Sequence, residues 1–223
     1  MLRGCYCPAV TRALVFDLDG TLVDTLPALA ASLNRVLAAA GCPGHPEAAV
    51  RGFVGNGVVM LIRRAVPEGV PDGRVAALAR EFRADYGARW AEGSWVYPGM
   101  HAALAALAGR APLAVWSNKP HRFTVAMIDG LFPGIPFAAV IGEREGVPRK
   151  PDPASATELV AALGHPPAAT TLVGDSVTDI LSARNAGFGV AAVTWGYGDR
   201  RELAAAGPDR WIGHPAELPA LLD

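Results

Sequence analysis

Short runs of apolar residues alternate with longer amphipathic stretches over most of the chain. Runs too short for helices are predicted to be buried strands at 13–16, 113–116, 138–141, 170–173 and 190–193, with a last edge strand at 210–212. Helices are predicted between them at 101–107, 121–131, 154–163 and 177–186. Strand and helix in alternation predict an α/β fold, a doubly wound parallel sheet with helices on both faces.

The block between residues 24 and 95 has a different pattern, with apolar residues at helical spacing and no strand-like alternation. One helix ends at Gly41, a second stretch starts near Glu47 and is interrupted at 55–57, and a third carries Phe82 and Tyr86 on one face. An ordinary crossover between parallel strands needs only a dozen or so residues. We therefore expect residues 1–23 and 97–223 to form the core, and residues 24–96 to form an inserted helical cap.

Composition narrows the class of protein further. The formal net charge of −1 over 223 residues, with both signs scattered, argues against a nucleic-acid-binding surface. No apolar run is long enough to span a bilayer, and Arg3 is followed by no apolar region typical of a secretory signal. The three cysteines, Cys5, Cys7 and Cys42, form no C-x-x-C pair. These features predict a reduced, cytoplasmic protein with no membrane partner.

Polar residues follow three of the predicted strands. Asp17 and Asp19 follow the first, Ser117 follows the second, and Asp175 follows 170–173. The carboxyl ends of strands in such a sheet share one rim, so these side chains are expected to converge, and Lys150 in the loop 142–153 can reach the same crevice. Neighbouring carboxylates repel unless they share a cation or a proton. The set suits a hard divalent cation together with a phosphoryl group.

Taken singly, each of these residues has a plainer explanation. Asp175 can cap the helix that follows it, and Asp179 can interact with the dipole of that helix. Lys150 alone would be a solvated loop charge, and Thr21 and Ser117 can satisfy backbone groups of turns. An EF-hand is excluded at residues 17–19 because Gly20 comes too early and no glutamate closes a twelve-residue loop. The set as a whole favours an active site.

The chain resembles the haloacid dehalogenase superfamily of hydrolases in four motifs that occur in order. They are Asp17-Leu18-Asp19-Gly20-Thr21, Ser117, Lys150 within Arg149-Lys150-Pro151-Asp152, and Gly174-Asp175-Ser176-Val177-Thr178-Asp179. The resemblance covers essentially the whole chain. It implies a Rossmann-like core with a helical cap, and a Mg²⁺-dependent phosphatase that acts through an aspartyl phosphate.

The resemblance also implies a role for each matching residue. Asp17 would be the nucleophile, and Asp19 the acid and base that serves the leaving alkoxide and then the water. The metal ligands would be the Asp17 carboxylate, the Asp19 backbone carbonyl and Asp175, supported by Asp179 and Ser176. Ser117, the amide of Asn118 and Lys150 would bind the phosphoryl group, with Thr21 also assigned to the substrate site.

Within the superfamily, the chain is most similar to the phosphoglycolate phosphatases. The similarity lies in 53–57 and 61–65 of the cap and in 97–99, 117–120 and 195–198, although Ser117 stands where those proteins usually have threonine. It implies 2-phosphoglycolate as the substrate. Either Arg63 or Arg64 is then expected to meet the substrate carboxylate, with Arg122 as the alternate donor; the other possibility is that both cap arginines face solvent.

Other activities remain open on the same fold. A sugar phosphate or pyrophosphate is an alternative substrate, and a phosphoglucomutase-like isomerase is an alternative enzyme. A dehalogenase proper uses no metal, so the presence of both Asp19 and Asp175 argues against it, and a non-enzymatic binding module would be expected to lack Asp17 or Asp19. In every case we expect a small phosphorylated metabolite as partner, a monomer or homodimer, and cap closure over hinges near Asp24 and 97–99.

Overall fold

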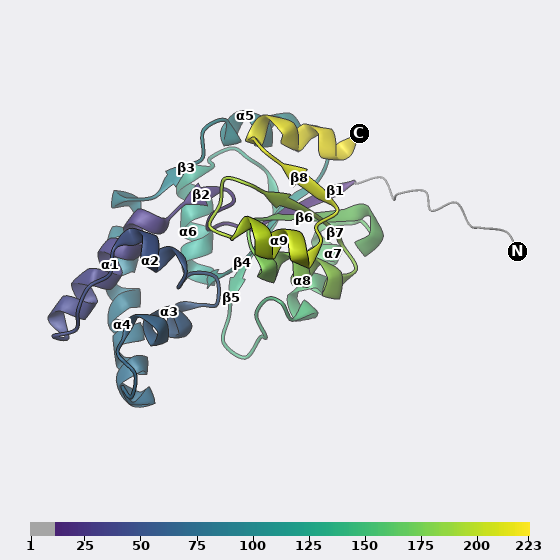
Figure 1. Ribbon diagram of the computed structural model, residues 1–223. Helices are drawn as coiled ribbons and strands as arrows, with labels where there is room; N and C mark the ends of the chain where they lie inside the picture. The colour runs from purple at the N-terminus through teal and green to yellow at the C-terminus, as the bar shows by residue number, and fades with distance from the viewer. Residues whose placement is uncertain (1–11) are drawn as a thin grey trace, which may run out of the picture.

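The computed structural model of the protein describes residues 12–223, so Arg3, Cys5 and Cys7 lie outside the described residues. Its main element is a six-stranded sheet in the order β5-β4-β1-β6-β7-β8, in which every pair of neighbours is parallel (Figure 1). The strands are β1 (Ala13–Phe16), β4 (Leu113–Pro120), β5 (Phe137–Glu143), β6 (Thr170–Gly174), β7 (Gly189–Val193) and β8 (Arg210–Ile212). All six predicted strands are therefore present, and the predicted fold class is confirmed.

Both faces of the sheet are covered, which explains why the strands are apolar at consecutive positions. In β1, Leu14 and Phe16 pack into one apolar cluster, while Ala13 and Val15 pack into another on the opposite face. The first cluster is completed by α5 (Met100–Ala108), α6 (His121–Leu131) and the C-terminal 3₁₀ helix Pro215–Leu222. The second is completed by α7 (Ala156–Leu163), α8 (Val177–Ala186) and α9 (Arg200–Ala206).

Shorter 3₁₀ turns are found at Trp90–Glu92, Pro153–Ser155 and Pro167–Ala169. None of the helices within residues 12–223 is long and apolar enough to cross a membrane.

The predicted helical block is also present. It contains α1 (Leu26–Ala39), α2 (Glu47–Arg51), α3 (Val58–Ala65) and α4 (Asp72–Arg89), which lie to one side of the sheet in Figure 1. These helices enclose an apolar cluster of their own, with Leu33, Ile62 and Phe82 fully buried or nearly so. A separate core supports our proposal that residues 24–96 form a cap on a core of 1–23 and 97–223.

A short two-stranded ribbon joins this block to the sheet, and the apolar pattern does not predict it. Val23–Asp24 (β2) pairs antiparallel with Trp95–Val96 (β3). Strands of two residues are too short to show a period of two. The ribbon holds the two chain crossings side by side, so both ends of the helical block enter and leave at one place.

Candidate active site

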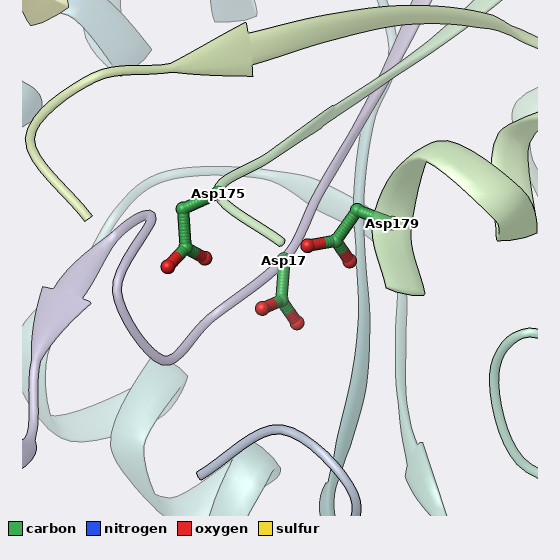
Figure 2. A group of neighbouring side chains, drawn as sticks. All are labelled: Asp17, Asp175 and Asp179. Carbon is green, nitrogen blue, oxygen red and sulfur yellow. The ribbon is translucent and has the colours of Figure 1, made fainter. Parts of the chain in front are cut away.

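Three carboxylates meet at the carboxyl edge of the sheet. Asp17 follows β1, Asp175 follows the adjacent strand β6, and Asp179 lies in the first turn of α8. One carboxylate oxygen from each lies within 4.8 Å of the others, and all three side chains are buried. Figure 2 shows the three side chains around one common space. The convergence of Asp17 and Asp175 follows from the pairing of β1 with β6, as parallel strands end at one rim.

A single buried lysine contacts this cluster. The ammonium of Lys150 donates to Asp17 Oδ1 at 2.9 Å, to Asp179 Oδ1 at 2.7 Å and to the backbone carbonyl of Trp116 at 2.7 Å. These contacts use all three of its N–H donors. Burial alone would lower the pKa of Lys150, but the charges of Asp17 and Asp179 and their hydrogen bonds raise it above its ordinary value. One positive charge thus faces three carboxylates.

The protein disfavours negative charge at this place without a cation. Burial raises the pKa of Asp17 to about 7, against the opposing effect of Lys150 and with the help of Asp179 and Asp19. Burial, together with Asp179 and Asp17, raises the pKa of Asp175 to about 8. A cation that prefers oxygen ligands would reverse this balance by favouring the ionised carboxylates. The residues present therefore fit a metal site.

Asp19 is turned away from the cluster although it lies only two residues from Asp17. Its Oδ1 accepts from the Lys119 ammonium at 2.8 Å and from the Thr25 hydroxyl at 2.6 Å. Neither partner belongs to the carboxylate cluster. The two carboxylates of the first motif are thus separated, with Asp17 in the carboxylate cluster and Asp19 bound to partners outside it.

Close packing around Asp175 fixes its orientation. Its Oδ1 accepts from the Thr21 hydroxyl at 3.0 Å, and its Oδ2 accepts from the Tyr197 backbone N–H at 2.7 Å. Gly20 has φ +83°, and a Cβ there would overlap the Asp175 carboxylate. A side chain at Gly196 would overlap Asp175 as well. Thr21 therefore acts on this site by holding Asp175.

Asp179 is oriented by the start of its own helix. Ser176 is the N-cap of α8, and a capping box joins the two residues: the Ser176 N–H and hydroxyl donate to Asp179 Oδ2 at 3.0 and 2.6 Å. The cap residue is thus Ser176 and not Asp175, which leaves the Asp175 carboxylate for the cluster. Asp179 therefore takes part in both the helix cap and the site. Its Oδ2 belongs to the capping box, and its Oδ1 accepts from the Lys150 ammonium.

Ser117 and Asn118 lie at the same rim on β4. Both are buried, and the Ser117 hydroxyl accepts from the Lys119 backbone N–H at 3.2 Å. The Asn118 side-chain amide donates to the carbonyl of Lys150 at 3.0 Å and to that of Gly55, in the helical block, at 3.1 Å. Its Oδ1 is buried and has no partner among residues 12–223. Asn118 therefore connects the rim of the sheet to the loop of the helical block that contains Gly55.

The cluster opens into a cavity of about 800 Å³ whose roof comes from the helical block. Its lining includes Asp17, Asp19, Ser117, Lys150, Asp175, Asp179, Asn56, Leu61, Arg64, Phe82, Tyr86 and Phe123. The Arg64 guanidinium donates to the carbonyl of Phe53 at 3.1 Å and to Asn56 Oδ1 at 2.7 Å. Arg64 thus reaches the cavity wall.

The structure does not bring Arg63 to this cavity. Its guanidinium donates to the carbonyl of Val70 at 2.6 Å and forms an ion pair with Asp72 at the start of α4. Arg122 is also absent from the lining within the described part of the chain, and its guanidinium lies 4.5 Å from the ring centre of Phe123. Of the three arginines considered from the sequence, only Arg64 is well placed.

The cavity lining includes residues that were not among the predicted site residues, and Lys119, Tyr86 and Arg51 are three of them. Arg51 of α2 donates to the carbonyls of Tyr197 and Gly196, each at 2.7 Å. Lys119 could have been found, because β4 runs to Pro120 and not to Trp116, and residues two apart on a strand lie on the same face. For Arg51 and Tyr86 the sequence holds no comparable signal, since their partners are distant in the chain.

A parallel sheet flanked by helices on both faces, with a buried acidic cluster and one lysine at its carboxyl rim, defines an α/β protein with a candidate metal centre. The family model described as haloacid dehalogenase-like hydrolase matches residues 14–193. The chain therefore belongs to the haloacid dehalogenase-like hydrolases.

Relatives with known names agree with this assignment along almost the whole chain. A phosphoglycolate phosphatase of Rhodospirillum rubrum is 38% identical over 222 residues, covering 92% of each chain. Another from Yersinia pseudotuberculosis is 36% identical, covering 94% of this chain and 93% of the relative. Among solved structures, a predicted phosphoglycolate phosphatase from Haemophilus somnus 129PT superposes with a TM-score of 0.87 at 31% identity, covering 96% of this chain and 98% of the other.

Proposed function

We propose that this protein is a Mg²⁺-dependent phosphatase that hydrolyses a small phosphomonoester, with 2-phosphoglycolate as the best candidate. The observation that carries the proposal is the separation of Asp17 from Asp19. One carboxylate lies in a buried cluster suited to a cation, and the other, two residues later, is held apart from it. The similarity to proteins named phosphoglycolate phosphatase supports the choice of substrate.

In the proposed reaction, Asp17 attacks phosphorus, the bond from phosphorus to the ester oxygen breaks, and an aspartyl phosphate forms. Asp19 donates its proton to the leaving alkoxide. Asp19 then accepts a proton from water, whose oxygen attacks the phosphoryl group, and phosphate leaves with Asp17 restored. The contacts of Asp19 with Lys119 and Thr25 support this division, because they keep its carboxylate out of the cation site.

The proposed phosphoryl contacts are the Ser117 hydroxyl, the amide of Asn118 and the Lys150 ammonium, which lie together at the rim. Mg²⁺, when bound by the Asp17 carboxylate, the Asp19 backbone carbonyl and Asp175, would offset the repulsion between nucleophile and substrate. Asp179 and Ser176 would support the metal site. Asp179 belongs to the carboxylate cluster itself, whereas Ser176 contacts the cluster through Asp179. Thr21 supports the same site through Asp175.

On the cap side, Arg64 is the arginine that we propose for substrate binding. The sequence alone gives Arg63 equal weight, but its ion pair with Asp72 makes it the weaker candidate. A cytoplasmic location and a monomeric or homodimeric state stay predictions from composition and resemblance.

The proposal is tested with purified protein, Mg²⁺ and a panel of phosphorylated compounds: 2-phosphoglycolate, a hexose phosphate, pyrophosphate and an alkyl phosphate that has no carboxylate. We expect the highest kcat/KM with 2-phosphoglycolate and its loss in Asp17→Asn. Phosphate release from the hexose phosphate alone would show that the substrate is a sugar phosphate and not 2-phosphoglycolate. Full activity of Asp17→Asn would overturn the mechanism.

A further inference from the structure

The buried ammonium of Lys119 has two partners and a remaining donor. It donates to Asp19 Oδ1 at 2.8 Å and to the Tyr86 phenol oxygen at 2.9 Å. Its side chain is 3% exposed, yet Lys119 contributes to the cavity wall. An ammonium has three N–H groups, and no third acceptor lies within hydrogen-bond distance among residues 12–223.

Tyr86 also has a hydrogen to give. Its oxygen accepts from Lys119, so the phenol O–H points elsewhere and meets the thioether of Met127 at 4.0 Å, and the buried Ser94 hydroxyl also interacts with the phenol. A thioether is a weak acceptor. Lys119 and Tyr86 thus present two underused donors that contact each other, one from β4 and one from α4.

The surroundings favour an anion at this pair. Phe82 lies stacked on Tyr86 with ring centres 5.6 Å apart, and Phe123 meets its edge at 5.7 Å. Both rings line the cavity and reduce the water around the ammonium. In an environment of low polarity, a charge-assisted hydrogen bond is stronger than in water.

The other cations of the cavity are less suited to the leaving-group end. Lys150 uses all three donors on Asp17, Asp179 and the carbonyl of Trp116. Arg64 and Arg51 donate to loop acceptors at the rim of the cavity, and the guanidinium of Arg200, which also lines the cavity, lies 5.5 Å from the ring centre of Trp211. Lys119 is the lysine in direct contact with Asp19, the residue proposed to serve the ester oxygen.

We propose that Lys119 and Tyr86 bind the carboxylate of the substrate and select phosphorylated 2-hydroxy acids over alkyl phosphates that have no carboxylate. In this class of ester, one carbon separates the ester oxygen from the carboxylate. An ester oxygen placed against Asp19 therefore brings the carboxylate next to the partner of Asp19, which is Lys119. The inference rests on the proposed phosphatase function and assigns specificity to a pair other than the cap arginines.

The test compares 2-phosphoglycolate with ethyl phosphate, in which a methyl group replaces the carboxylate. For Lys119→Met, kcat/KM for 2-phosphoglycolate is expected to fall roughly 10- to 100-fold more than that for ethyl phosphate, because one charge-assisted bond is lost. Arg80→Met, an exposed position on the same helix as Tyr86, is the matched control and should keep the wild-type ratio. Equal losses for both esters would mean that Lys119 only orients Asp19, and the inference would be wrong.

A binding measurement separates this inference from the proposed activity. By calorimetry with Mg²⁺ present, wild type should bind 3-phosphonopropionate more tightly than propylphosphonate, and Lys119→Met should lose most of that preference. An inactive wild type contradicts the phosphatase proposal, while an unchanged preference in Lys119→Met contradicts this one. If Lys119→Met does not fold, Tyr86→Phe should lower the preference about threefold. An unchanged preference in Tyr86→Phe would contradict the inference in the same way.

Discussion

Asp17 and Asp19 lie two residues apart on one turn, yet their carboxylates contact different lysines. Lys150 meets Asp17 at 2.9 Å, and Lys119 meets Asp19 at 2.8 Å. Two neighbouring carboxylates that share one cation are expected to act together, whereas carboxylates with separate partners can act separately. This arrangement supports a division of labour between a nucleophile at the cation site and an acid–base group beside the leaving oxygen.

The division predicts different effects for two matched substitutions. Asp19→Asn should lower kcat by about 10²- to 10⁴-fold, the range typical of lost acid–base catalysis, and still show a rise in Tm on adding Mg²⁺. Asp17→Asn should lose activity and also lose much of that rise, because Asp17 belongs to the cluster. The measurement is a thermal melt of each variant with and without Mg²⁺. A lost metal effect in Asp19→Asn alone would reverse the assignment.

The stability of the metal-free protein should depend on pH in a defined direction. Burial, reinforced by neighbouring carboxylates, raises the pKa of Asp17 to about 7 and that of Asp175 to about 8, from an ordinary 3.8. The folded state then holds protons that the unfolded state releases. This contribution is fully present below the ordinary pKa and is lost as the pH rises through about 7 to 8.

Asp175→Asn isolates that contribution. In EDTA near pH 8 the variant should melt above the wild type, because it lacks a buried charge, and the gap should close towards pH 4. With Mg²⁺ the order should reverse, since the wild type keeps its ligand. A variant that melts below the wild type at pH 8 in EDTA would contradict the electrostatic account of the cluster.

Removing Lys150 should be costly for stability as well as for activity. Lys150→Met leaves Asp17 and Asp179 buried with no cationic side chain, and removing one partner of a buried pair costs about 3–5 kcal/mol. Urea unfolding in EDTA measures it. Arg184→Met, which breaks the exposed pair with Asp209, is the control and should cost at most about 1 kcal/mol. Similar costs for the two variants would show that the Lys150 pairs contribute little.

Arg51 should affect substrate use without much effect on folding. It joins α2 to the carbonyls of Gly196 and Tyr197, and with the bond from Asn118 to Gly55 it holds the helical block over the rim. Arg51→Met should raise KM for 2-phosphoglycolate several-fold, because closing the cavity then gains fewer contacts. Arg74→Met, an exposed arginine of α4 paired with Glu81, should leave KM unchanged. An unchanged KM in Arg51→Met would show that the contacts of Arg51 do not help to close the cavity over the substrate.

The apolar pattern was sufficient for the strands, the helices and the convergence of Asp17 with Asp175. These depend on local periodicity and on the shared rim of a parallel sheet. The pattern could not predict the β2–β3 ribbon, whose strands are two residues long. It also could not decide which of Arg63 and Arg64 reaches the cavity. That choice depends on the ion pair between Arg63 and Asp72, nine residues further along the chain.

The contact between Lys119 and Tyr86 could not be predicted from the sequence for a related reason. The two residues are 33 positions apart and belong to different elements, β4 and α4. Helical spacing identified Tyr86 as an inward-facing residue of its helix, but only the docking of that helix over the rim brings its hydroxyl to the lysine. Contacts of this kind depend on how two packed units meet and carry no signature in either segment.

The most direct test of the central claim is a rapid acid quench of the enzyme with 2-phosphoglycolate and Mg²⁺, followed by mass spectrometry of its peptides. The account predicts one added phosphoryl group on the peptide that contains Asp17, and none in Asp17→Asn. Phosphate release by the wild type with no phosphoryl group on Asp17 at any quench time would contradict it.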